Sequence, residues 1–244
     1  MRRFMIHSRS ICDGVASFDG GTYNHMVRVL RLGIGDAVQL ADEEGVVYSG
    51  TINEVTQERV GVNITAIVPA ARSDAPQITI CQALPKGDKI DFILQKGTEL
   101  GAHDFRLFGG RRSVARVRDE QQAGKRERWQ RIAAEAARQC GRSDIPVVGW
   151  HPDAVEVIGD ISHELRLILW EGEKEHSLKE VLSVSGKPSS VIVAIGPEGG
   201  FDPLEVEQFI QHGFQPVSLG ARILRTETAS VAILAVMQYI WDEM

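Results

Sequence analysis

Two glycine-bearing turns near the C-terminus combine backbone freedom with charged side chains. The first turn has the sequence IGPEGGF at residues 195–201, and the second begins the sequence LGARILRTETA at residues 219–229. Glycine allows positive φ and close approach of a ligand to the backbone. The second turn also carries Arg222 and Arg225, whose guanidinium groups could bind an anion or stabilise developing negative charge. We therefore take the two turns together as the candidate site.

The elements around these turns predict where they lie in the fold. Each turn follows a short apolar run that is too short for a helix, which indicates a buried parallel strand. A helix is expected from Thr226, with oxygens of Glu227 and Thr228 near the free N–H groups of its first turn. One such turn is typical of any α/β domain, but two of them at the carboxyl ends of strands favour a ligand site. Neither turn is a P-loop or a Gly-x-Gly-x-x-Gly motif, which disfavours phosphate cradling and classical dinucleotide binding.

The motifs IGPEGG and LGxRILRTETA closely resemble the C-terminal signature of the SPOUT-type methyltransferases that modify uridine N3 in small-subunit ribosomal RNA. The segments HxxxVLR at residues 25–31, QKxTELG at 95–101 and EAxxQxxR at 135–142 extend the resemblance over nearly the whole chain. The resemblance implies an α/β fold with a knotted (trefoil) parallel-sheet domain whose two turns wrap S-adenosylmethionine. Spacing and periodicity do not predict a knot, because true knots are very rare.

The resemblance also suggests roles for individual side chains. Arg225 is the candidate for stabilising the uracil oxygens, and Glu198 and Glu227 are candidates for accepting the N3 proton or for orienting Arg225. Glu171, at the end of another predicted strand, could bind the donor or could only cap the helix that follows. The positions expected to contact S-adenosylmethionine are Glu171, Gly172, Ile195, Gly196, Pro197, Gly199, Leu219, Gly220, Ile223, Leu224, Thr226 and Thr228.

The charge distribution favours a nucleic-acid partner despite a formal net charge of −6. Residues 106–142 carry eleven Lys or Arg and four Asp or Glu, so basic charge is concentrated in one stretch. A solvated helix face would give the same pattern, and for the individual lysines that explanation is the more common one. The candidates for ribosomal RNA contact are His25, Arg28, Arg31, Lys86, Arg111, Arg112, Arg138 and Arg142.

The hydrophobic pattern predicts two domains. Residues 1–70 show regularly spaced short strands, interrupted by one helix with Met26, Val29 and Leu30 on its packing face, and predict a small β-barrel. The resemblance implies that this barrel is PUA-like and binds RNA. Residues 69–76 contain prolines without apolar periodicity and indicate a linker, and residues 77–244 begin with a βαβ pattern. A long helix over residues 119–140 is expected to present arginines on one face, oriented by Glu135, and to pack Trp129 and Cys140 on the other.

Composition excludes several other classes. No apolar stretch approaches the roughly 20 residues that span a bilayer, and the N-terminus lacks the apolar segment of a signal peptide, so we expect a cytoplasmic protein. The three cysteines and seven histidines have no metal-ligand spacing, so we expect buried reduced thiols and no metal. The helix from Thr226 to Trp241 is apolar nearly all round, which, with the resemblance, predicts a homodimer.

Two other functions remain open at this point. A related SPOUT methyltransferase would modify a tRNA base or a ribose 2′-OH, and the product nucleoside distinguishes that case. A non-catalytic RNA-binding ribosome assembly factor would use the barrel and the basic helix without binding the donor. The two turns show no degeneration, which disfavours the assembly factor.

Overall fold

The computed structural model describes residues 2–42, 46–68, 75–142, 144–159 and 161–242. The chain divides into two compact units, the first made of residues 1–73 with 137–145 and the second of residues 74–136 with 146–244. Most of the expected linker, residues 69–74, lies outside the described residues. No helix in the described ranges is long and apolar enough to cross a membrane.

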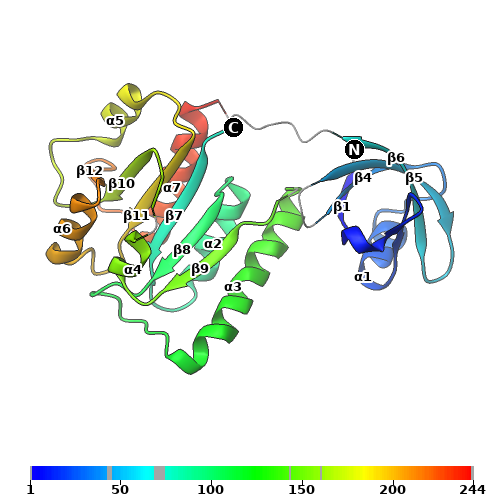
Figure 1. Ribbon diagram of the computed structural model, residues 1–244, viewed down its shortest axis with the longest axis horizontal. Coiled ribbons are helices and arrows are strands. Elements are labelled where there is room, and N and C mark those ends of the chain that lie inside the picture. The colour runs from blue at the N-terminus through cyan, green and yellow to red at the C-terminus, as the bar shows by residue number, and fades with distance from the viewer. Residues whose placement is uncertain (1, 43–45, 69–74, 143, 160, 243–244) are drawn as a thin grey trace. The chain divides into compact units, whose positions relative to one another are not determined.

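The first unit, drawn mainly in blue and cyan in Figure 1, is built on a six-stranded sheet with the strand order β1-β4-β5-β6-β3-β2. β1 pairs with β4 in parallel, and the other neighbours are antiparallel. The strands are β1 (Arg2–Met5), β2 (Ile11–Cys12), β3 (Val15–Phe18), β4 (Ala37–Ala41), β5 (Val47–Val55) and β6 (Val60–Val68). Their inward side chains form a small core that includes Phe4, Phe18 and Leu40, as expected for alternating strands that bury one face.

The expected helix in this unit has an unusual geometry. It starts as α1 (Gly20–Tyr23) and continues as a π-helical segment, η2 (Asn24–Val29). Met26 is fully buried as predicted and Leu30 packs against the core, but Val29 is 66% exposed and Val27 takes its place. The prediction for Val29 was wrong because a π-helix has more residues per turn than the 3.6 assumed, so the apolar face shifts.

The second unit contains a six-stranded, all-parallel sheet with the order β12-β10-β11-β7-β8-β9. A parallel sheet of this kind was predicted, and β11 lies at its centre between β10 and β7. The strands are β7 (Gln77–Ala83), β8 (Asp104–Phe108), β9 (Val147–His151), β10 (Leu165–Leu169), β11 (Ser190–Ile195) and β12 (Gln215–Val217). The helices are α2 (Lys89–Glu99), α3 (Asp119–Cys140), α4 (Ala154–Ile158), α5 (Leu178–Ser185), α6 (Pro203–Gln211) and α7 (Thr226–Ile240).

Helices cover both faces of this sheet. Val191, Val193 and Ile195 of β11 face a core completed by α2, α3, α5 and α7, whereas Ile192 and Ala194 face a second core completed by α4 and α6. Burial on both faces explains why β11 is an uninterrupted apolar run. All six strands point the same way, so the loops after β10, β11 and β12 leave from one edge of the sheet (Figure 1).

Some helical details differ from the sequence predictions. α3 has the predicted bounds and buries Trp129, but Cys140 and also Cys12 are exposed, so only Cys81 is a buried thiol. Burial in an apolar environment raises the pKa of the Cys81 thiol strongly. The prediction that Glu135 orients arginines of α3 was wrong, because Glu135 forms no ion pair with any described residue, whereas Arg128 of α3 pairs with Asp91 of the adjacent α2.

Candidate functional site

A cavity of about 1050 Å³ opens at the carboxyl edge of the parallel sheet. Its walls come from three loops, at residues 170–177 after β10, 196–201 after β11 and 218–225 after β12, together with the start of α7. Both glycine turns singled out from the sequence therefore border one cavity. The volume is that of a typical small-molecule site.

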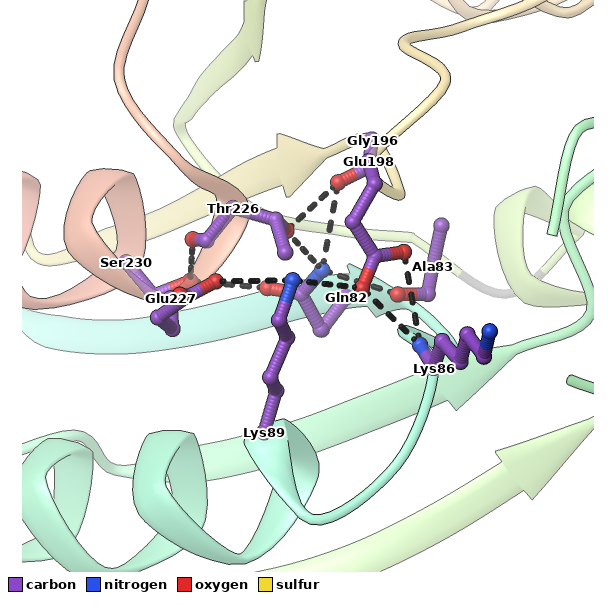
Figure 2. Close-up of polar contacts among 9 residues, drawn as sticks. All are labelled: Gln82, Ala83, Lys86, Lys89, Gly196, Glu198, Thr226, Glu227 and Ser230. Atoms are coloured by element: carbon purple, nitrogen blue, oxygen red, sulfur yellow. Dashed lines mark hydrogen bonds and ion pairs between the residues drawn. The ribbon is translucent and has the colours of Figure 1, made fainter. Parts of the chain in front are cut away.

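A buried polar network fixes the first turn where it leaves β11 (Figure 2). The hydroxyl of Thr226 donates to the carbonyl of Gly196 at 2.7 Å, and Nε2 of Gln82 donates to the Thr226 hydroxyl at 2.9 Å. The Ser230 hydroxyl donates to Oε1 of Gln82 at 2.7 Å. Gln82, Thr226 and Ser230 are all at most 5% exposed. Because buried polar groups are costly when unpaired, this network holds β7, β11 and α7 in one arrangement.

Charged contacts hold the middle of the same turn (Figure 2). The Glu198 carboxylate accepts from the backbone N–H of Lys86 at 3.0 Å and from Nζ of Lys89 at 2.8 Å. Lys89 Nζ also lies 3.6 Å from Oε2 of Glu227, an oxygen that is buried without a hydrogen bond. Burial alone would raise the pKa of Glu198, but the hydrogen bonds from Lys89 and the backbone prevail and lower it. The hydrogen bond to Glu198 raises the pKa of Lys89, so this group remains a cation.

Glycine is favoured at the end of the first turn by the backbone conformation there. Gly200 has φ +69°, which strains any other residue, and the carboxylate of Glu171 from the loop after β10 lies beside it. Glu171 makes no hydrogen bond or ion pair to any other described residue, and Ser177, not Glu171, caps the following helix α5. Its carboxylate oxygens are therefore available to a ligand in the cavity. At Gly172, a Cβ would force the Trp170 indole to move.

The second turn is held mainly at its ends. Ser218 joins it to the start of α5, where the N–H of Leu178 donates to the Ser218 carbonyl at 3.0 Å. From residue 221 to residue 225, no side chain forms a hydrogen bond or ion pair within the described part of the chain, and Ile223 is 87% exposed. Arg225 occupies the N-cap position of α7 without capping it. Its guanidinium is therefore free to contact a bound molecule.

Most residues that the sequence indicated for donor binding line this cavity. Gly172 and Thr228 do not line it, and Thr228 is exposed on α7. Of the catalytic candidates, Glu198 and Arg225 line the cavity. Glu227 does not line it but forms an ion pair with Lys89, which does. The indicated residues that line it are Glu171, Ile195, Gly196, Pro197, Gly199, Leu219, Gly220, Ile223, Leu224 and Thr226.

The candidate RNA-binding residues lie in both units. In the first unit His25, Arg28, Arg31 and Arg138 are exposed, and Arg31 has the unusual φ of +54°. Arg142 pairs with Asp144 and its side chain is only 17% exposed, which leaves it less available than the others. The remaining exposed candidates are Lys86, Arg111 and Arg112, which lie in the second unit.

The sequence analysis did not identify Gln82 and Ser230 as residues of the site. It also did not predict that Lys89 pairs with Glu198. A signal for Gln82 was present, because a polar amide within the apolar strand β7 needs buried partners. The described residues contain no group of three or more His, Cys, Asp or Glu arranged to hold a metal ion.

Comparisons with known families and proteins agree with this arrangement. The RNA methyltransferase domain family matches residues 72–238, and the RNA methyltransferase PUA domain family matches residues 18–64. The chain is 33% identical over 228 residues to the ribosomal RNA small subunit methyltransferase E of Bacillus subtilis, covering 91% of this chain and 89% of that protein. It is 31% identical over 236 residues to the Synechocystis protein of the same name, covering 96% and 76%.

A solved structure shows the same fold. The crystal structure of a ribosomal RNA small subunit methyltransferase E from Neisseria gonorrhoeae, bound to S-adenosyl methionine, is similar with a TM-score of 0.79 and 29% identity. The similarity covers 99% of this chain and 98% of that chain. The two-unit architecture is thus shared over the whole length.

Proposed function

This chain belongs to the ribosomal RNA small subunit methyltransferase E family, and we propose that it methylates N3 of a uridine in that RNA. It is an S-adenosylmethionine-dependent RNA methyltransferase that acts on small-subunit ribosomal RNA. The observation that carries the finer proposal is Arg225, an uncommitted guanidinium on the wall of the cavity between the two glycine turns.

The residues of the cavity fit S-adenosylmethionine. The donor combines an adenosine, a sulfonium cation and an amino acid, so it needs apolar walls, carboxylates and exposed backbone. Leu169, Ile195 and Leu224 supply apolar surface, the Glu171 carboxylate supplies hydrogen-bond acceptors, and the glycines of both turns expose backbone. When bound, the donor supplies an electrophilic methyl group. Its transfer breaks the carbon–sulfur bond and converts the sulfonium into a neutral thioether.

The side chains of the protein have to manage the negative charge that develops on uracil. N3 of uracil carries a weakly acidic proton, and its loss places charge on the neighbouring oxygens. Arg225 stabilises that charge, helped by the cationic Lys89 on the same cavity. Glu198 is a poor proton acceptor, because its carboxylate is held by Lys86 and Lys89 and its pKa is lowered. Glu227, with one oxygen free of hydrogen bonds, is the better candidate.

The finer features of the fold belong to the same proposal. We infer that the loops after β10 and β12 form a trefoil knot around the donor, supported by the pairing of Ser177 with Ser218 that joins them. We also infer that the first sheet closes into a PUA-like barrel, with domain limits at residues 1–70 and 77–244. The exposed basic residues of both units would bind the ribosomal RNA.

The setting of the reaction is also proposed. We place the protein in the cytoplasm, where small-subunit ribosomal RNA is found. A homodimer would cover α7, on which Val236, Tyr239 and Ile240 are 38%, 75% and 39% exposed.

The test is methyl transfer from labelled S-adenosylmethionine to unmodified small-subunit particles and to naked small-subunit RNA, followed by nucleoside analysis. We expect 3-methyluridine as the labelled product. A 2′-O-methylated nucleoside, or label appearing only in tRNA, would show that the chain is a methyltransferase of another target. Absence of donor binding would instead favour an RNA-binding assembly factor.

A further inference from the structure

The segment between β8 and α3 carries four arginines within eight residues, at positions 111, 112, 116 and 118. Its start is tied to α6: the backbone N–H of Arg111 donates to Oε1 of Glu205 at 2.8 Å, and Glu205 is only 1% exposed. The other oxygen of Glu205 accepts from the N–H of Asp202, which completes the capping box of α6. A buried, fully engaged carboxylate therefore anchors this basic segment beside the N-terminus of α6.

Arg112 extends this anchorage to the first glycine turn. Its Nη1 donates to the carbonyl of Gly199 at 3.2 Å, and its Nε lies 3.8 Å from Oδ2 of Asp202. Asp202 is itself oriented by the α6 cap, where it accepts from the N–H of Leu204 at 3.1 Å. The Arg112 side chain also packs closely beside Gly199, because a Cβ added to Gly199 would lie 3.4 Å from Cβ of Arg112.

The end of the turn lies between two side chains, of which only Arg112 forms a hydrogen bond to it. Arg112 donates to the Gly199 carbonyl, and the Glu171 carboxylate lies beside Gly200 without a hydrogen bond. Gly199 and Gly200 both line the cavity, whereas Arg112 does not. Any change in Arg112 would therefore reach the cavity through the backbone of the turn.

We propose that Arg112 is a positioning residue of the donor cavity rather than a simple phosphate contact: its guanidinium holds the Gly199 carbonyl and so sets the shape of the turn that binds S-adenosylmethionine. The inference rests on the proposed function in taking this cavity as the donor site. It also gives RNA bound to the arginine segment a direct physical connection to the donor, and such coupling is reciprocal between the two ligands.

The test measures the dissociation constant of S-adenosylmethionine without RNA for the wild-type protein and for Arg112→Ala, Arg112→Lys and Arg118→Ala. Arg118 is the matched control, since its exposed side chain makes no hydrogen bond or ion pair within the described residues of the same segment. We expect Arg112→Ala to weaken donor binding about fivefold to tenfold, the net worth of one partly exposed hydrogen bond. Arg112→Lys keeps one cationic donor and should recover part of this loss, while Arg118→Ala should bind the donor like the wild type.

The affinity for unmodified small-subunit RNA, measured at several salt concentrations, separates the two roles. Arg118→Ala should reduce the slope of log affinity against log salt concentration by about 1, as expected for the loss of one phosphate contact. Arg112→Ala should leave this slope unchanged. Donor affinity of Arg112→Ala within twofold of the wild type, in a variant with an unchanged thermal unfolding midpoint, would overturn the inference and leave the proposed function intact. A wild-type protein that fails to bind the donor would overturn both.

Discussion

The two glycine turns that border the cavity look alike in sequence but are held in different ways. The turn after β11 is fixed along its whole length, by Thr226 at Gly196, by Lys86 and Lys89 at Glu198, and by Arg112 at Gly199. The turn after β12 has no comparable side-chain contacts over residues 221–225 within the described chain, and its arginines and Ile223 are exposed.

This difference indicates that the two turns, which form two walls of the cavity, have different functions. A wall that is already ordered costs little conformational entropy when a ligand binds, so the first turn is suited to holding the donor. The uncommitted Arg225 on the second wall can form its contacts with the substrate, where negative charge develops during the reaction. Substitutions in the two turns should therefore have different consequences.

The largest effect is expected on the second wall. Arg225→Ala removes a guanidinium that forms no hydrogen bond or ion pair with the described residues, so folding should be unaffected while methyl transfer falls about 100-fold. Single-turnover methylation and donor affinity should be measured together, with Arg222→Ala from the same turn as the control. A loss in methyl transfer of less than tenfold for Arg225→Ala, or an equal loss for Arg222→Ala, would remove the role assigned to Arg225.

An intermediate effect is expected where the first wall is built. Thr226→Val keeps the side-chain shape but removes the hydroxyl that donates to Gly196 and accepts from Gln82, so the free energy of unfolding should fall by about 1–2 kcal/mol. Donor affinity should fall several-fold with it. Thr228→Val is the matched control, because Thr228 is exposed and does not line the cavity. Equal losses of donor affinity in both variants would contradict the preformed wall and restore Thr228 as a donor contact.

The smallest effect is expected at Glu198 and should depend on pH. Because the folded protein lowers the pKa of Glu198 below 4.5, the ionised carboxylate stabilises the native state at neutral pH. That contribution is lost as pH falls from 4.5 through the lowered pKa. Glu198→Gln should therefore reduce the free energy of unfolding by less than about 1 kcal/mol at neutral pH, since the carboxylate is partly exposed, and the difference from the wild type should shrink in acid.

Urea unfolding across this pH range is the measurement, and Glu207→Gln, an exposed carboxylate on α6, is the control. A difference for Glu198→Gln that does not change with pH would mean that the carboxylate charge does not hold the turn. If Glu198→Gln lost as much methyl transfer activity as Glu227→Gln, Glu198 would again be a candidate for accepting the N3 proton.

Local pattern alone was enough to predict much of the molecule. The apolar run of β11 is buried on both faces, so its sequence identifies a central parallel strand. Each glycine turn comes directly after a predicted strand, which placed both turns at the carboxyl edge of the sheet. The bounds of α3 and the start of α7 at Thr226 were predicted correctly, because helical periodicity is a property of neighbouring residues. The resemblance, carried by the same turns, identified the family.

Contacts between distant segments could be decided only by the tertiary structure. Gln82 and Ser230 are 148 residues apart, and nothing in either local sequence indicates that they share a hydrogen bond. The same holds for Arg112 with Gly199 and for Lys89 with Glu198, where the partner determines whether a charged residue solvates a surface or holds a turn. Sequence determines which residues can do chemistry, because residue type and local period are written in it. Which of them meet depends on the order of strands in the sheet, and that order is a property of the folded chain.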